Sequence, residues 1–320
     1  MGKNINILFV SKQNLNVGSH RIWIHDLCNY FHKIGVTTKI GLESDVSNFD
    51  VIIYGKNETP QKIKNKIVGH INPDGWRKHN CDFIIVGSLE EKDSLSINRN
   101  VFIFPLIENM FSNKPIKRHK NSSLLELCYH GNESHLTSFN PNLKSALEIF
   151  SEEKNIKLTI ICGNSDFKWS IGKPDINIDF KKWSIKSIEN DIRSCDIGIC
   201  PNALEPLNRP HKAVTKLGFY ESDYTLRFKN KSNAGRAFVF HQLGIPVIAD
   251  FTPSHFHILG NPDCGYIAMS KDGWLSALRK LSCSKHRNFI SQNARKEFER
   301  LYDPIDWVRK LHHSILNIKQ

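Results

Sequence analysis

The chain has 320 residues, of which 40% are hydrophobic and 24% are charged. This composition excludes disordered, collagen-like and fibrous proteins, and the length predicts about two domains whose cores need neither disulfides nor structural metal. The 44 Lys and Arg residues outweigh 32 Asp and Glu residues, for a net charge of +12. Such an excess favours anionic partners such as nucleotides, sugar phosphates, anionic lipid head groups or nucleic acid. The plain alternative is a lysine excess that serves only solubility.

The eight cysteines are scattered along the chain and form no Cys-x-x-Cys pair. Several lie in apolar runs, as Cys128 and Cys162 do, where a free cysteine behaves as a small hydrophobic residue. This usage is typical of a reduced, cytosolic protein. The N-terminal stretch is too short and polar for a signal peptide, and no apolar run approaches the ~18 residues that span a membrane. We therefore expect a soluble, cytoplasmic protein.

In the first third of the chain, short apolar runs alternate with helical patterns, which predicts an α/β fold with a parallel sheet. A strand at 5–10 leads through a polar loop into a helix that starts at about His20 and stops at Gly35. Further strands are expected at 38–42, 51–54, 66–71, 83–86 and 101–104. Residues 108–123 are polar and basic and contain a proline, so we expect a linker there.

The strand–helix alternation restarts after this linker. We expect strands at 124–130, 157–162, 197–200 and 246–249, and helices at 141–150, 185–194, 233–243, 274–281, around 286–302, and at 303–317. Residues 201–230 contain three prolines and many charges, so they are expected to form an inserted loop. The predicted architecture is two Rossmann-like, doubly wound domains at 1–118 and 119–302, followed by a terminal helix at 303–320.

The first candidate site is the loop after the first strand, which contains Gly18, Ser19, His20 and Arg21. A turn between a strand and a helix directs backbone N–H groups and the positive helix end toward the carboxyl edge of the sheet, where α/β proteins bind anions. The loop matches neither a dinucleotide fingerprint nor a Walker A motif. The plain alternative is a turn in which Ser19 caps the helix.

The second candidate site comprises Lys231, Ser232, Asn233 and Arg236, immediately before and within a predicted helix. Ser232 or Asn233 is expected to cap the helix, and the two cations add positive charge to its first free N–H groups. Together these groups would cradle a diphosphate. The plain alternative is a basic cap on an exposed loop.

Two histidines lie at the ends of predicted strands. His70 is a candidate base or hydrogen-bonding residue facing the cleft, and His130, followed by Gly131, occupies the equivalent place in the second half. Each has a structural alternative, because most lone histidines are structural. The sequence contains no His-Glu-x-x-His, no Asp-x-Asp and no Gly-x-Ser-x-Gly, so it predicts neither a metal site nor a serine hydrolase.

Residues 228–250 resemble the donor-binding segment of GT-B glycosyltransferases, in which a capped helix ends in Gly-x-Pro-Val-Ile-Ala. Residues 127–131, 188–201 and 264–278 resemble neighbouring parts of the same donor domain, and residues 18–21 and 82–88 resemble parts of the acceptor domain. The resemblance covers most of the chain, and the order and spacing of its segments carry more weight than any single motif.

The resemblance implies a GT-B fold, in which two Rossmann-like domains face each other across a cleft and the C-terminal helix returns to the N-terminal domain. It also implies transfer of a sugar from a nucleotide-sugar to a saccharide or lipid-linked acceptor. His130, Gly131, Lys231, Ser232, Asn233 and Arg236 would bind the donor, and residues 18–21 would lie on the acceptor side. Catalytic roles would fall to His70, Lys231 and Arg236.

The sequence departs from the family at one point. Many retaining enzymes of this fold carry Glu-x7-Glu in the donor segment, but the two positions here hold Lys231 and Val239. Whether the reaction retains or inverts configuration is therefore left open. We expect a metal-free reaction without a cofactor, in which Lys231, Ser232, Arg236 and the helix dipole stabilise the departing diphosphate. The counter-interpretation is a Mg²⁺ carried by the donor's phosphates and held by Glu205, Asp250 or Asp74.

The preferred interpretation is a transferase of surface-polysaccharide synthesis that contacts the anionic inner face of the membrane. Three alternatives remain: a nucleotide-sugar-binding protein without activity, a nucleotide-sugar epimerase, and a nucleic-acid glycosyltransferase. The last would need basic and aromatic residues clustered along the acceptor cleft, and the scattered lysines disfavour nucleic acid as a partner.

Overall fold

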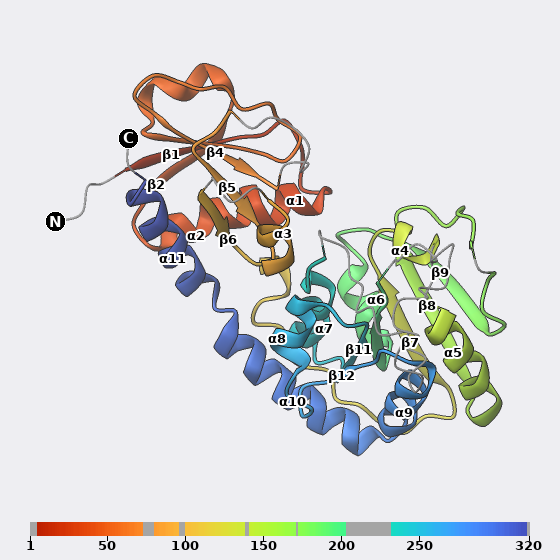
Figure 1. The fold of residues 1–320 in the computed structure, drawn as a ribbon. Coiled ribbons are helices and arrows are strands. Elements are labelled where there is room, and N and C mark those ends of the chain that lie inside the picture. Colours follow the sequence, from red (N-terminus) through yellow and green to blue (C-terminus); the bar gives the residue numbers. More distant parts are fainter. Residues whose placement is uncertain are drawn as a thin grey trace, which may run out of the picture.

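The computed structural model describes residues 5–72, 80–95, 100–137, 141–170, 172–202 and 232–318. Within these ranges the chain forms two six-stranded sheets, one from each half, and all the strand pairs within them are parallel. The two sheets lie in separate parts of the molecule, each with its own helices (Figure 1). This is the doubly wound α/β architecture that the sequence predicts.

The N-terminal sheet has the order β2-β1-β3-β4-β5-β6. Its strands are β1 (Asn6–Val10), β2 (Thr37–Gly41), β3 (Val51–Tyr54), β4 (Ile67–Ile71), β5 (Phe83–Val86) and β6 (Asn100–Ile103). Its helices are α1 (Gly18–His20), α2 (Leu27–Lys33) and α3 (Leu89–Asp93), and a π-helical segment, Arg21–Asp26, joins the first two. The order reverses between β1 and β3, so the loops that follow these two strands lie side by side at one edge.

The C-terminal sheet has the order β12-β11-β10-β7-β8-β9. Its strands are β7 (Leu125–His130), β8 (Ile156–Cys162), β9 (Asn177–Lys182), β10 (Ile197–Cys200), β11 (Val247–Ala249) and β12 (Tyr266–Ile267). Its helices are α4 (Ser134–Thr137), α5 (Pro141–Glu153), α6 (Ile188–Ser194), α7 (Gly235–Leu243), α8 (Pro253–Leu259), α9 (Lys271–Leu281) and α10 (Ser284–Leu301). Here the order reverses between β7 and β10.

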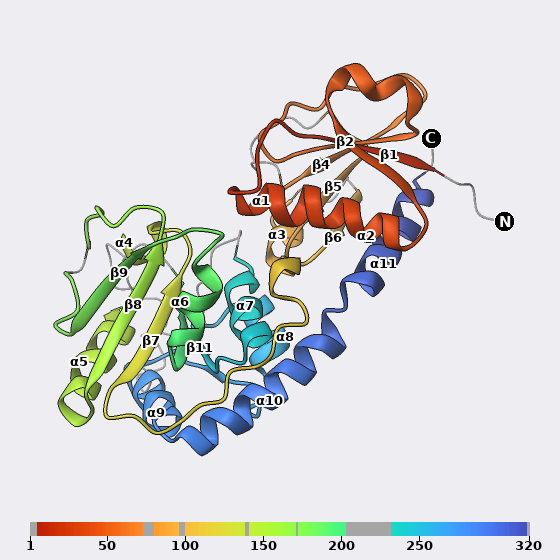
Figure 2. The ribbon, with the colours of Figure 1, turned by 180° about the vertical axis from the view of Figure 1, so that it is seen from behind.

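The last helix, α11 (Pro304–Leu316), packs against the N-terminal sheet. Its buried side chains Val308, Leu311 and Ile315 belong to the same core as β1, β3 and α2. In both views α10 and α11 run one after the other from the C-terminal part to the N-terminal part (Figure 1, Figure 2). The apolar stripe of α11 is therefore buried on the N-terminal domain, although α11 directly follows α10 of the C-terminal domain. The domain boundaries at 118 and 302 stay a prediction.

Some expected elements differ from the observed ones. The first helix begins at Gly18, two residues before the predicted start. Helix α7 begins at Gly235 after the N-cap residue Ala234, so neither Ser232 nor Asn233 caps it, although Asn233 Oδ1 accepts a hydrogen bond from the Gly235 N–H (3.2 Å). The predicted inserted loop lies almost wholly outside the described residues. None of the described helices is both long and apolar enough to cross a membrane.

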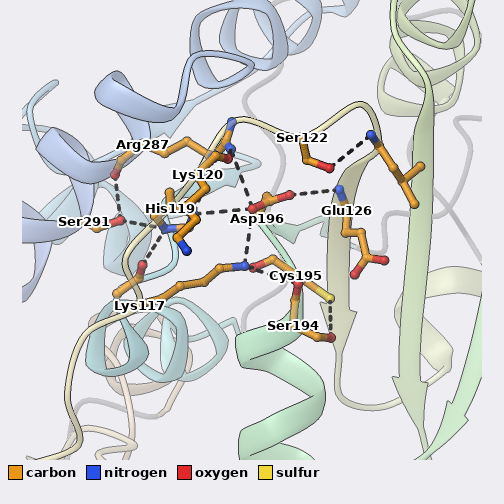
Figure 3. A network of polar contacts seen from close by, with 12 residues as sticks. Lys117, His119, Lys120, Ser122, Glu126, Ser194, Cys195, Asp196, Arg287 and Ser291 are labelled. Carbon is orange, nitrogen blue, oxygen red and sulfur yellow. Dashed lines mark hydrogen bonds and ion pairs between the residues drawn. The ribbon is translucent and has the colours of Figure 1, made fainter.

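The segment expected to be a linker is bound to the C-terminal domain over residues 117–120. The buried carboxylate of Asp196 lies 3.3 Å from Lys117 Nζ, 3.5 Å from His119 Nδ1 and 3.7 Å from Arg287 Nη2 (Figure 3). His119 Nε2 also donates to the Gly244 carbonyl (2.8 Å), at the end of α7. Burial alone would raise the pKa of Asp196, but the hydrogen bond with His119 and the charges of Lys117 and Arg287 lower it to about 2.

Gly244 lets the linker pass close to α7. It adopts the left-handed conformation (φ 71°), and a Cβ atom there would lie 2.7 Å from Ile116 Cβ and 2.8 Å from the Lys117 nitrogen. The Lys117 N–H donates to the Leu243 carbonyl at 2.9 Å. A side chain at position 244 would therefore displace the segment that carries Lys117 and His119, two of the contacts of Asp196.

We predict that Asp196→Asn lowers the free energy of unfolding at pH 7 by about 2–4 kcal/mol, because it leaves buried cations without their anion. The folded-state pKa is depressed, so this contribution is present above about pH 4 and is lost as the pH falls toward 2. Urea unfolding at a series of pH values measures both effects. Asp272→Asn, whose side chain is 85% exposed, is the control and should change stability by less than about 0.5 kcal/mol. Equal stability losses in the two variants would contradict the assignment.

Candidate functional site

The candidate site lies where the strand order of the C-terminal sheet reverses. β7 ends at His130 and β10 ends at Cys200, and these two strands are parallel neighbours. Ligands of open α/β sheets bind at such a reversal, outside the carboxyl ends of the strands. The first turn of α7 lies against the same place, because Arg236 contacts residues that follow both strands. The structure thus brings the predicted residues His130, Gly131 and Arg236 together.

Arg236 is held at this edge by two contacts. Its Nη2 donates to the Pro201 carbonyl (3.0 Å), and its guanidinium lies 5.2 Å from the centre of the Tyr129 ring. Among the described residues, its Nη1 is buried without a hydrogen-bond partner and the guanidinium has no ion-pair partner. A partly buried cation whose Nη1 is shielded from water is costly unless an anion compensates it, so this position favours an anionic ligand.

Gly131 makes room for Arg236. Its φ angle is +128°, a conformation that L-residues rarely adopt, and a Cβ atom here would lie 3.3 Å from Arg236 Cδ. The backbone conformation favours glycine at this position, and the Arg236 side chain would have to shift by a few tenths of an ångström to admit a Cβ atom.

Asn202 adds a second polar group to the site. Its backbone N–H donates to Asp250 Oδ2 (2.6 Å), and its side-chain Oδ1 lies 3.5 Å from the Ser232 hydroxyl, which donates to it. Its Nδ2 is buried and has no hydrogen-bond partner among the described residues. A donor held in this way beside Arg236 and Ser232 suits a phosphate or hydroxyl oxygen.

The histidines around Arg236 are neutral at physiological pH. Burial, together with the charge of Arg236, lowers the pKa of His130 to about 3 and that of His255 to about 4. The His130 ring packs edge-on against Phe240, with 4.9 Å between the ring centres, and its Nε2 lies 3.4 Å from the Arg236 carbonyl oxygen. His130 therefore supports α7 as a neutral, largely packed residue.

The other predicted site residues lie elsewhere or are not described. Lys231 lies outside the described residues, as do Glu205 and Asp74. His70 is the penultimate residue of β4, buried, and paired in register with Tyr54 and Ile84. Its catalytic role stays a prediction.

The predicted acceptor loop has structural contacts of its own. His20 Nδ1 is 2.9 Å from Ser11 Oγ at the end of β1. Arg21 forms a bidentate ion pair with Glu108 (3.0 and 2.8 Å), donates to the Leu15 carbonyl, and lies 5.3 Å from the centre of the Trp183 ring. Arg21 therefore joins the two domains, while acceptor contact by Gly18, Ser19, His20 and Arg21 stays a prediction.

Asn202 is not among the predicted site residues. It is the second residue after β10, and its place at a strand end is the same signal that marks His130 and Gly131 at the end of β7. Among the residues that the structure describes, no three or more His, Cys, Asp or Glu side chains are grouped so as to hold a metal ion.

We predict that Gly131→Ala lowers the free energy of unfolding by about 1–3 kcal/mol, because alanine must adopt a strained backbone conformation and press on Arg236. Chemical denaturation measures the change. The matched control is Gly163→Ala, at the end of the neighbouring strand β8, where a Cβ atom would meet nothing within 4 Å. The control should change stability by less than about 0.5 kcal/mol. An equally small change in the free energy of unfolding for Gly131→Ala and Gly163→Ala would contradict this interpretation.

No protein-family profile matches this chain, and no curated protein matches it in sequence. Solved structures do resemble it. HepE from Anabaena, in complex with UDP and glucose, has a TM-score of 0.64 at 9% identity, and the alignment covers 98% of this chain and 100% of HepE. A glycosyltransferase from Rickettsia africae has a TM-score of 0.59 at 11% identity, with 99% and 100% covered.

TarM from S. aureus has a TM-score of 0.59 at 10% identity, and the alignment covers 83% of this chain but 54% of TarM, so the chain spans about half the length of that protein. Likeness at this level of identity shows a common fold. Two parallel six-stranded sheets, a helix that returns to the N-terminal sheet and full-length alignment to glycosyltransferases agree: the chain has the GT-B fold.

Proposed function

We propose that this chain is a glycosyltransferase that moves a sugar from a nucleotide-sugar to a glycan or lipid-linked acceptor. The observation that carries the proposal is the partly buried guanidinium of Arg236, whose Nη1 is buried without a hydrogen-bond partner among the described residues and which lies at the first turn of α7. The first N–H groups of a helix lack intrahelical acceptors, and the helix dipole makes this end positive. A nucleoside diphosphate would supply the missing negative charge.

The same groups suit the chemistry of sugar transfer. As the bond between the sugar and the diphosphate breaks, negative charge develops on the departing phosphate oxygen. Arg236, the Nδ2 of Asn202 and the start of α7 are fixed before the reaction, so they stabilise this charge without reorganising. We propose that Lys231 adds a second cation and that Ser232 contributes its hydroxyl. His70 is proposed to position donor or acceptor from the N-terminal domain.

The solved structures that resemble the chain support this choice of substrate. HepE was solved with UDP and glucose, and a pneumococcal O-GlcNAc transferase was solved with UDP and GlcNAc. We extend this to the present chain as a UDP-type or related nucleotide-sugar donor. We also propose a cytoplasmic role in surface-polysaccharide synthesis, with the net charge of +12 attracting the protein to the anionic inner face of the membrane.

The first test uses Arg236→Ala. We expect its turnover with the preferred donor to fall by roughly 10²–10³-fold, because a charge-assisted contact to the leaving diphosphate is lost. The donor is first chosen by thermal shift with UDP-, GDP-, CMP- and dTDP-sugars, since a bound ligand raises the melting temperature. The control is Arg309→Ala, whose side chain is 66% exposed on α11. Normal turnover and nucleotide affinity in Arg236→Ala would refute the anion site, and binding of a nucleotide-sugar without any transfer would favour an inactive binding protein.

The second test concerns metal. The sequence has no Asp-x-Asp motif, and we propose that protein cations and the helix dipole neutralise the diphosphate. We therefore expect nearly unchanged turnover in excess EDTA. Turnover should weaken as salt rises, since partly exposed charges are screened over a Debye length of about 8–10 Å. Loss of activity in EDTA that Mg²⁺ or Mn²⁺ restores would instead show that a metal ion accompanies the donor.

A further inference from the structure

Helix α3 of the N-terminal domain contacts the backbone of the candidate site across the domain boundary. The hydroxyl of Ser88, the N-cap residue of α3, donates to the Ser232 carbonyl at 2.6 Å. The same oxygen accepts a hydrogen bond from the Glu91 N–H at 3.1 Å, so Ser88 both caps the start of its own helix and binds the other domain. Both Ser88 and Ser232 are buried. Water therefore does not readily replace this hydrogen bond.

The next residue but one makes a second contact of this kind. Glu90 Oε1 accepts hydrogen bonds from the Ser254 backbone N–H (3.2 Å) and from its hydroxyl (2.7 Å). Ser254 lies in the first turn of α8, directly after β11, and Glu90 is 3% exposed. One short helix thus holds two segments of the C-terminal domain, the one that precedes α7 and the one that follows β11.

The contact with Ser232 leads directly to the site. The Ser232 hydroxyl donates to Asn202 Oδ1, which orients the amide whose Nδ2 has no partner among the described residues. Ser232 also precedes Asn233, whose side chain accepts the first N–H of α7. The Ser88 contact therefore joins α3 to the backbone that arranges Asn202 and the start of α7, and its loss would let this backbone shift as a unit relative to the N-terminal domain.

We propose that Ser88 and Glu90 are positioning residues that fix the donor-binding backbone relative to the N-terminal domain. The proposal rests on the glycosyltransferase function proposed above. In a transferase whose donor and acceptor lie on different domains, a misplacement of about 1 Å between them costs about 10²-fold in rate. The two contacts from α3 would hold that distance, while Arg236 and Asn202 hold the nucleotide from the C-terminal domain alone.

The test begins without ligand, so that it does not depend on the function. Amide hydrogen exchange of residues 232–238 is measured in the wild-type protein, in Ser88→Ala and in Ser88→Thr, which keeps the hydroxyl. We expect Ser88→Ala to exchange about tenfold faster over this segment, as loss of a buried hydrogen bond predicts, and Ser88→Thr to match the wild type. The matched control is Ser270→Ala, which removes the N-cap hydrogen bond of α9 (3.1 Å to the Gly273 N–H) away from this contact. It should leave exchange over 232–238 unchanged.

The second readout separates positioning from packing. In Ser88→Ala we expect kcat to fall about tenfold or more while the Kd for UDP changes less than about threefold, because the nucleotide contacts stay on one domain. Ser88→Thr should restore kcat. Should Ser88→Ala fail to fold, Ser254→Ala removes the hydroxyl contact to Glu90 and should lower kcat in the same direction, whereas Asp93→Ala, exposed on the same helix, should not.

Unchanged exchange over 232–238 in Ser88→Ala would overturn the proposed contact. Faster exchange with unchanged kcat would leave it a packing contact and equally overturn the positioning role. Absence of transfer by the wild-type protein with every donor would instead refute the proposed function, and the exchange data would still report on the contact itself.

Discussion

The buried carboxylate of Asp196 lies just before β10 and within 4 Å of the Lys117 ammonium, the His119 ring and the Arg287 guanidinium. An anion removed from water needs such partners, and here they come from the linker and from α10. Their arrangement fixes the path of the linker along the end of α7 and the direction in which α10 leaves the C-terminal domain. Because α11 follows α10, the same carboxylate determines where the chain can return to the N-terminal sheet.

Central strands were readable from the sequence because parallel strands are buried on both faces and appear as continuous apolar runs. Residues 51–54, 83–86 and 197–200 were predicted with the observed limits for this reason. The strand Asn177–Lys182 was missed, because it lies at the edge of its sheet and alternates apolar with charged residues. The short helix α8 was missed as well, since its seven residues are too few to show a helical period.

The candidate site was readable only in part. The sequence placed His130, Gly131 and Arg236 at one edge because strand ends and helix starts carry local signals. It did not show that Arg21 pairs with Glu108, since the two lie 87 positions apart and Glu108 belongs to a segment with the composition of a linker. Gly244 is a related case: it belongs to the Gly-x-Pro pattern on which the family resemblance rests, yet its observed contacts are with Ile116 and Lys117. The roles of Arg21 and Gly244 thus depend on contacts between segments that are far apart in the sequence, which local patterns do not reveal.

The chain passes between the two domains twice, once through the segment that follows β6 and once between α10 and α11 (Figure 2). Two rigid domains joined by one short linker can rotate relative to each other about several independent axes. A second connection removes most of these rotations and leaves chiefly the rotation about the line through both connections. Any relative movement of the two domains in this protein would therefore be chiefly a rotation about one axis. The positions of residues 104–116 and 302–303 would set that axis.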